Sequence, residues 1–278
     1  MVEQEYSVLM PLAPWEEPWI LEGALNSILN QTLAPVEVVI STDGVISEEL
    51  NKVIEQSGLA VKVVSGPGNE GVGPVLARGS EVVRTEIVVR ADSDDINDRK
   101  RCAMLVEMLV TKEYLSVVGS RMVEFEQKGK AFKRELKWER ICPLTVEGIR
   151  RSTRFRNPMN HPTVAFRKSR IIAIGSYRSV SGFEDYDLWC RIVADGGKLM
   201  NVDRVLVLAR VGKEHRKRRR GIKYVCNEIR FYKKCWDERL MERWWVILMG
   251  LARIPIRLMP SCVIGRVMIA AGRRLPQN

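Results

Sequence analysis

The sequence is poor in the residues that build disulfide or zinc frameworks. Its 278 residues include two histidines and six cysteines, and the cysteines form no CxxC pair: Cys102, Cys142, Cys190, Cys226, Cys235 and Cys262. This usage favours free thiols in a reducing cytosol over disulfides or a zinc site. A secretion signal is not expected either, because the N-terminus is acidic and its first apolar segment, residues 7–12, is short.

Long uncharged apolar runs are absent as well. The apolar segments over residues 244–249 and 264–271 are separated and followed by arginine and proline, and no run reaches the roughly 18 residues of a spanning helix. The net charge of +11 is concentrated before them, with seven Lys or Arg residues against one acid over residues 210–220. Helices of this composition lie in a membrane interface, where basic residues attract anionic lipid. We predict a basic, amphipathic, helical C-terminal extension over residues 213–278 that associates with an anionic membrane surface. The alternative is that the run 216–220 is only a solvated face.

The first ninety residues repeat a strand-then-helix rhythm. Apolar patterning predicts strands over residues 6–12, 36–41, 61–64 and 86–90, with helices over residues 18–31, 48–56 and 72–84. This alternation favours an α/β fold with a Rossmann-like, mostly parallel central sheet flanked by helices. Ligands of such sheets bind outside the carboxyl ends of the strands. Asp43 and the segment after Arg90 are therefore expected to share one crevice.

The segment after Arg90 places four carboxylates within seven residues, in the string ADSDDIND over residues 91–98. Like charges this close raise each other's pKa unless solvent or a metal neutralises them. Hard oxygen ligands suit Mg²⁺ or Mn²⁺, and a diphosphate would complete the coordination. The alternative is a solvated loop that caps a helix over residues 99–109.

The second half is less regular. Strands are predicted over residues 115–123 and 163–166, with a polar excursion over residues 127–138. The string SGFEDYDLW over residues 181–189 is a second acidic cluster, which opens a helix that continues to Ala194. A helix dipole accounts for one or two of these acids, whereas a general base accounts for an exposed carboxylate at this place.

Seven segments, taken in order, carry a family resemblance: SVLMP (7–11), LNSILNQT (25–32), VEVVI with Asp43-Gly44 (36–44), GNEGVG (68–73), RADSDDI (90–96), HPT (161–163) and EDYDLW (184–189). In this order and spacing the chain resembles the family 2 glycosyltransferases with the GT-A fold, in the bacterial surface-polysaccharide branch similar to amylovoran-type glycosyltransferases. The resemblance covers roughly residues 5–210, and the tail resembles the same branch. It implies a GT-A domain over residues 1–212, with a nucleotide-sugar half about 1–98 and an acceptor half about 99–212.

The resemblance also implies roles for single residues. It implies that the nucleotide sugar is bound by Pro11, Asp43, Gly71, Arg78, Asp92 and Ser93. Asp94 would hold the metal together with Asp92, and the neighbouring Asp95 could substitute. Asp185 would be the general base, with Glu184 as second candidate, and His161 and Trp189 would lie on the acceptor side. Three alternatives stay open: a structural His161, a core position for Trp189, and a plain tight turn at residues 71–73. The chain departs from the family after its first strand, where residues 13–16 read APWE instead of an aromatic residue plus Asn.

The implied function is inverting transfer of a hexosyl group from a nucleotide-diphosphate sugar, with a UDP-sugar favoured. The implied acceptor is a lipid-linked oligosaccharide or polysaccharide in surface polysaccharide biosynthesis. Mn²⁺ or Mg²⁺ would neutralise the departing diphosphate while a carboxylate deprotonates the acceptor hydroxyl. The protein is expected in the cytoplasm, peripheral on the inner face of the plasma membrane. The rival hypotheses are a catalytically silent scaffold on the same fold and a basic nucleic-acid-binding protein. Nucleic acid is disfavoured because the basic residues are not interleaved with stacking aromatics.

Overall fold

The computed structural model describes residues 5–131, 133–212, 221–258 and 273–274. Its first half alternates strands and helices in the predicted order, and the predicted ends differ from the observed ones by no more than two residues. The elements of this half are β1 (Tyr6–Leu12), α1 (Pro18–Leu29), β2 (Glu37–Thr42), α2 (Glu48–Glu55), β3 (Val61–Ser65), α3 (Val72–Val82) and β4 (Ile87–Arg90).

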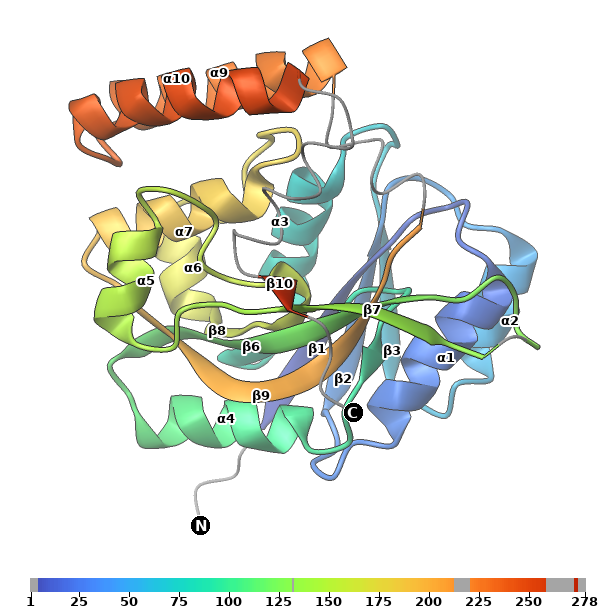
Figure 1. Cartoon of the computed structure of the whole chain (residues 1–278). Coiled ribbons are helices and arrows are strands. Elements are labelled where there is room, and N and C mark those ends of the chain that lie inside the picture. The colour runs from blue at the N-terminus through green and yellow to red at the C-terminus, as the bar shows by residue number, and fades with distance from the viewer. Residues whose placement is uncertain (1–4, 132, 213–220, 259–272, 275–278) are drawn as a thin grey trace.

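Strands β3, β2, β1 and β4 lie side by side in that order and are all parallel (Figure 1). Val8 at the centre of β1 pairs with Val38 of β2 on one side and with Val89 of β4 on the other. All three valines are fully buried. Near-continuous apolar strands of this kind form where helices cover both faces of a parallel sheet. The predicted Rossmann-like first half is therefore confirmed.

The second half completes a mixed sheet. Its elements are β5 (Ile96–Asn97), α4 (Arg101–Thr111), β6 (Leu115–Glu126), β7 (Glu135–Arg140), α5 (Val146–Ser152), the 3₁₀ helix η1 (His161–Thr163), β8 (Ala165–Arg167), α6 (Lys168–Ala173), α7 (Glu184–Ala194) and β9 (Lys198–Arg210). Strand β8 lies antiparallel between β4 and β6, and β9 runs parallel to β6 and antiparallel to β5. The polar segment predicted over residues 127–138 overlaps strand β7. The first two residues of β7, Glu135 and Leu136, are exposed, so the sequence of this strand resembles that of a loop.

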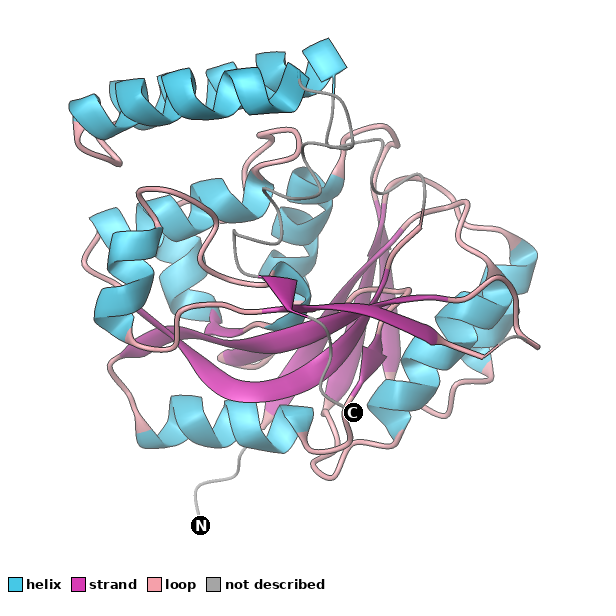
Figure 2. Ribbon diagram, viewed as in Figure 1, coloured by secondary structure: helices cyan, strands magenta, loops and turns pink. Residues whose placement is uncertain are grey.

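Two apolar clusters fill the two faces of the sheet. Helices α1, α2 and α4 cover one face, where Leu25, Leu50 and Leu105 pack on strand residues such as Val8. Helices α3, α5, α6 and α7 cover the other face, where Trp189 is fully buried. Figure 2 shows these two layers of helices around the strands. The α/β fold class is thus the predicted one.

Two further helices, α9 (Gly221–Asp237) and α10 (Arg243–Leu258), lie together beside α7 (Figure 1). They share a third apolar cluster with α7, in which the ring of Phe231 stacks on Phe183 with 5.0 Å between centroids. Glu228 is fully buried and pairs with Arg253 at 2.8 Å. The predicted extension is therefore helical over these residues, and none of the described helices is long and apolar enough to cross a membrane. The basic run 216–220 and the apolar segment 264–271 lie outside the described residues. A short strand, β10 (Arg273–Arg274), pairs with β7.

Candidate active site

The first part of the site lies at the carboxyl end of β2. The carboxylate of Asp43 accepts hydrogen bonds from the backbone amides of Glu70, at 2.9 Å, and Gly71, at 3.1 Å. Arg78 of α3 pairs with Glu70 at 2.7 Å and donates to the Thr42 carbonyl at 3.3 Å. The loop before α3 is thereby fixed across the end of β2. Three of the residues expected at the nucleotide sugar, Asp43, Gly71 and Arg78, are thus brought together.

The adjacent strands bring in the other residues expected at the donor. Pro11 lies near the end of β1, where it pairs with Ser41 of β2. Ser93 is nearly buried in the loop that follows β4. Because β4 is the neighbour of β1 on the other side, this loop emerges at the same edge of the sheet as Asp43. The ends of three parallel strands, β1, β2 and β4, therefore bring the residues expected at the donor to one edge of the sheet.

Three aspartates of this loop form an acidic cluster. One carboxylate oxygen from each of Asp92, Asp94 and Asp95 lies within 4.8 Å of the others. Asp92 forms a two-pronged ion pair with Arg90, one contact of which is 2.6 Å long. Burial raises the pKa of Asp94 to about 7, and the charges of Asp92 and Glu16 add to this, whereas Arg210 opposes it. Burial and the charges of Asp94 and Asp92 also raise the pKa of Asp95 well above its usual range.

The cluster fits a divalent cation. One oxygen of Asp95 accepts the backbone amide of Arg210 at 2.7 Å, but its other oxygen is buried without a hydrogen-bond partner. A buried carboxylate oxygen that lacks a donor is costly, and two further carboxylates beside it make a hard oxygen ligand set for Mg²⁺ or Mn²⁺. The solvated-loop alternative does not describe Asp95, which is 3% exposed. Helix α4 starts at Arg101 without a side-chain cap.

Two residues of this region escaped the sequence-based reasoning. Glu16 lies close enough to the cluster for Asp92 to raise its pKa, although burial is the larger cause. Arg210 ends β9 and donates from its Nε to the Asp94 carbonyl at 3.2 Å. Glu16 was noticed only as part of a departure from the family pattern. Arg210 was noticed only as part of the basic run 210–220, because its contact with Asp94 joins residues 116 positions apart in the chain.

The second acidic cluster lies in the first turn of α7. Asp185 accepts a hydrogen bond from the side-chain amide of Asn157 at 2.5 Å and one from the Tyr186 backbone amide at 2.8 Å. The oxygen of the Asn157 side chain accepts the Met159 amide at 3.1 Å, which fixes the orientation of the amide group. Glu184 accepts the Gly182 amide at 3.0 Å. The Asn157 side chain therefore orients the carboxylate of Asp185.

His161 and Tyr177 form a contact pair, and the charges of both acidic clusters act on Tyr177. The Nε2 atom of His161 lies 3.1 Å from the Tyr177 hydroxyl. Burial raises the pKa of Tyr177, Arg90 lowers it, and Asp185 and Asp92 both raise it, so the two carboxylates act on one hydroxyl from separate elements. Burial and the charge of Arg90 hold the pKa of His161 well below its usual range, so the ring is neutral at pH 7. Sequence reasoning did not find Tyr177.

Trp189 packs against His161 within the apolar core. The side chain has no exposed surface, and its ring lies edge-on to His161 with 6.0 Å between centroids. With no exposed surface, Trp189 cannot itself touch an acceptor. This position agrees with the alternative of Trp189 as a core residue.

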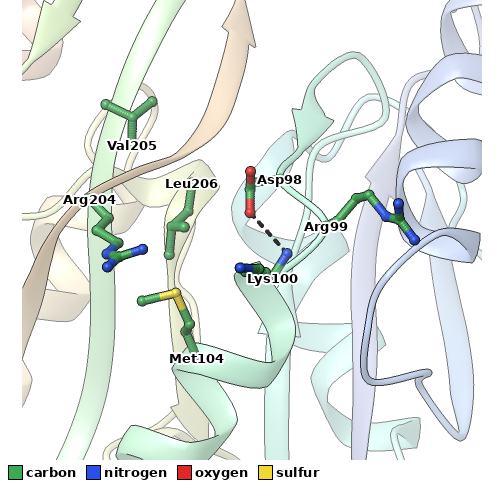
Figure 3. Close-up of a pocket in the computed structure, with 7 residues that line it drawn as sticks. All are labelled: Asp98, Arg99, Lys100, Met104, Arg204, Val205 and Leu206. Atoms are coloured by element: carbon green, nitrogen blue, oxygen red, sulfur yellow. Dashed lines mark hydrogen bonds between the residues drawn. The ribbon is translucent and has the colours of Figure 1, made fainter.

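A separate hollow opens beside the start of α4, with a volume of about 390 Å³. Figure 3 shows its lining residues, which come from the turn before α4, from α4 itself and from β9: Asp98, Arg99, Lys100, Met104, Arg204, Val205 and Leu206. No residue expected at the donor, metal or acceptor lines it. This hollow is therefore separate from the residues expected at the site.

Comparison with known proteins agrees with this architecture. The model of glycosyl transferase family 2 matches residues 15–174, and the chain belongs to this family of glycosyltransferases. A UDP-Gal:alpha-D-GlcNAc-diphosphoundecaprenol beta-1,3-galactosyltransferase of Escherichia coli is 34% identical over 269 residues, which cover 95% of this chain and 94% of the relative. The amylovoran biosynthesis glycosyltransferase AmsE of Erwinia amylovora is 34% identical over 230 residues, 82% of this chain and 84% of the relative.

Solved structures share the fold. The mannosyltransferase PcManGT of Pyrobaculum calidifontis, in complex with GDP-Man and Mn²⁺, superposes with a TM-score of 0.65 at 17% identity over 98% of this chain and 76% of that chain. Residues 1–349 of S. aureus TarS, in complex with UDP-GlcNAc, give a TM-score of 0.63 at 16% identity over 91% of this chain and 72% of that chain. The resemblance to GT-A glycosyltransferases is therefore confirmed at the level of the fold.

Proposed function

We propose that this enzyme transfers a hexosyl group, with inversion, from a nucleotide-diphosphate sugar to an acceptor hydroxyl. The observation that carries the proposal is the buried, unpartnered oxygen of Asp95 within the Asp92, Asp94 and Asp95 cluster, beside the Asp43 loop. Asp92, Asp94 and Asp95 would hold Mn²⁺ or Mg²⁺, and this cation would neutralise charge on the departing diphosphate. Two acidic clusters on separate elements suit two tasks, leaving-group stabilisation and proton removal.

The protein's own residues supply the remaining steps. Asp43 and the loop it holds would bind the nucleoside, because the carboxylate keeps acceptor capacity beyond its two backbone amides. Asp185, oriented by Asn157, would take the proton of the acceptor hydroxyl as that oxygen attacks the anomeric carbon. The neutral pair of His161 and Tyr177 would contact the acceptor between the two clusters.

The substrates are inferred from the relatives. One relative with 34% identity uses UDP-Gal and an undecaprenol-diphosphate-linked acceptor, and another serves amylovoran biosynthesis. We infer a UDP-sugar donor and a lipid-linked oligosaccharide or polysaccharide acceptor in bacterial surface polysaccharide biosynthesis. The test is calorimetric titration with UDP, GDP and CDP, each with and without Mn²⁺. Metal-dependent binding of UDP supports the proposal, and binding of none of the three contradicts it.

Two variants separate the assigned roles. Asp94→Ala is expected to abolish metal-dependent turnover, and full activity in this variant would refute the metal assignment. Asp185→Asn is expected to keep metal-dependent UDP binding and lose transfer by about 10² to 10⁴. Loss of UDP binding in Asp185→Asn would make this residue a ligand of the donor instead of a base.

We also infer that the GT-A domain over residues 1–212 is held on the inner face of the plasma membrane by the extension over residues 213–278. Support comes from α10, where Trp244, Ile247, Leu248 and Leu251 are exposed at the i, i+3, i+4, i+7 spacing of one helix face. The adjacent Trp245 instead packs on Phe155, with 4.4 Å between ring centroids. An apolar stripe on a chain with net charge +11 suits an anionic bilayer surface.

Point variants test this attachment better than truncation, because α9 shares an apolar cluster with α7. Flotation of the full chain with anionic liposomes is expected to fall in the double variant Trp244→Ser, Leu251→Ser. The control is Val45→Ser, which also replaces an exposed apolar side chain by serine but lies far from α10 in the sequence. It is expected to float like the wild type. Equal flotation of the double variant and the wild type would refute the role of the stripe.

A further inference from the structure

The guanidinium of Arg210 is held in place beside the acidic cluster by two aromatic rings. Its central carbon lies 4.9 Å from the ring centroid of Trp19 and 4.8 Å from that of Phe125. Both distances are within the range of cation–π attraction. The hydrogen bonds of the side chain go to neutral oxygens, the Asp94 carbonyl at 3.2 Å and the Gln127 side chain at 3.4 Å. The position of the charge therefore depends on the rings and on neutral acceptors.

The backbone of Arg210 also takes part in the cluster, because its amide donates to Asp95 at 2.7 Å. This contact persists when the side chain is changed. A substitution at Arg210 therefore removes the charge while leaving in place the bond that holds Asp95. The effect of the charge can be measured separately from the effect of the loop anchor.

The positive charge of Arg210 favours the ionised forms of Asp94 and Glu16. The Nε atom of Arg210 donates to the Asp94 carbonyl at 3.2 Å and its backbone amide donates to Asp95 at 2.7 Å, so this charge lies beside two of the proposed metal ligands. A second cation that acts on Asp94 is Arg90, which is already engaged with Asp92. In the absence of a metal, Arg210 thus partly neutralises the carboxylates that would bind one. A divalent cation that enters the cluster meets repulsion from Arg210.

We propose that Arg210 is an exchangeable counter-ion, which balances the acidic cluster when the metal is absent and pairs with the diphosphate of the donor when metal and donor are bound. This inference rests on the proposed nucleotide-sugar donor. A planar guanidinium fixed between two rings presents its edge without further ordering, and such an edge matches phosphate oxygens. When the bond from the anomeric carbon to the diphosphate oxygen breaks, its electron pair stays on the diphosphate, so Arg210 would also stabilise the leaving group.

The proposal predicts effects of opposite sign in one variant. Full-length Arg210→Gln, freed of metal, is expected to bind Mn²⁺ alone about tenfold more tightly, because one repelling charge is gone. At saturating Mn²⁺ it is expected to bind UDP about tenfold more weakly, because a charge-assisted contact is lost. Arg210→Lys should keep the wild-type affinity for Mn²⁺ but lose part of the UDP affinity, since an ammonium lacks the planar edge.

The matched control is Arg134→Gln, because the guanidinium of Arg134 lies 5.8 Å from the centroid of the same Phe125 ring. This control should change both affinities little. Equal effects in Arg134→Gln and Arg210→Gln would refute a specific role and point to the summed charge of the region. Weaker binding of both Mn²⁺ and UDP in Arg210→Gln would show a merely structural role. If the wild type binds Mn²⁺ but no UDP, the proposed donor fails, and the Mn²⁺ affinities alone still decide whether Arg210 is the counter-ion.

Discussion

Replacing Asp94 by asparagine is expected to stabilise the metal-free protein, and to do so more at pH 8 than at pH 5. The pKa of this carboxyl rises from 3.8 to about 7 on folding, mainly through burial. An acid with a raised pKa contributes stability that is present below the unfolded-state pKa and is lost as the pH rises through the folded-state pKa. A difference of about 3 pKa units corresponds to at most about 4 kcal/mol, lost between about pH 4 and pH 7.

Asparagine keeps the shape of the side chain and cannot ionise, so it avoids this loss. At about 2 °C per kcal/mol for a chain of this size, Asp94→Asn should melt up to roughly 8 °C above the wild type at pH 8 in EDTA. The advantage should shrink at pH 5, where Asp94 is protonated in the folded state. Thermal unfolding followed by circular dichroism measures both values.

Added Mn²⁺ should reverse the order of the two proteins at pH 8. The cation compensates the charges of the wild-type cluster and stabilises the fold by mass action, whereas Asp94→Asn has lost a ligand. The reasoning is refuted if Asp94→Asn melts at or below the wild-type temperature in EDTA at pH 8. An equal gain from Mn²⁺ in both proteins would exclude Asp94 as a ligand.

Three further predictions follow from single contacts. Asn157→Ala should lower kcat by about tenfold or more while UDP binding measured by calorimetry stays unchanged, because the bond that orients Asp185 is lost together with the bond to the Met159 amide, and neither is made by a residue expected at the donor; weaker UDP binding would contradict this. Gly73→Ala should lower the free energy of unfolding in urea by about 1–3 kcal/mol, because the new Cβ would lie 2.3 Å from the Arg178 carbonyl oxygen. Gly250→Ala, whose new Cβ would meet no atom within 4 Å, should not lower it. Equal urea midpoints for the two variants would contradict this. His161 should show no titration above pH 6.5 in NMR spectra, because burial and Arg90 disfavour its charged form; a midpoint above that pH would contradict this.

Local sequence was sufficient to predict the first half of the fold. Strands β1, β2 and β4 are buried, and β2, β3 and β4 are rich in β-branched residues. Turn residues separate the strands from the helices, so the order of these elements is visible in the sequence. Strand β7 was missed because its exposed side chains read as a polar loop. The place of β8 between β4 and β6 depends on pairing between distant segments, which no local pattern records.

The same distinction applies to the site. The turn at Asp43 and the two acidic strings are each a continuous stretch of sequence. They could therefore be recognised from their composition and their order along the chain. Arg210, Tyr177 and Asn157 act through contacts with residues far along the chain, such as the 115-residue separation between Asp95 and Arg210. The local sequence around each of the three does not record these contacts. Only the folded chain shows what they touch.

The arrangement of β9 restricts how this enzyme can be re-engineered. Its last residue, Arg210, is bonded to the loop that carries the aspartates, and soon after it the chain continues into helices that cover Phe183 and Tyr186 of the α7 region. A minimal version that ends before Arg210 would lose part of the acidic site, although every family motif would be retained. A version that ends at residue 212 would uncover the apolar side of α7. Fusion partners and purification tags are therefore unsuited to the boundary between the domain and its extension.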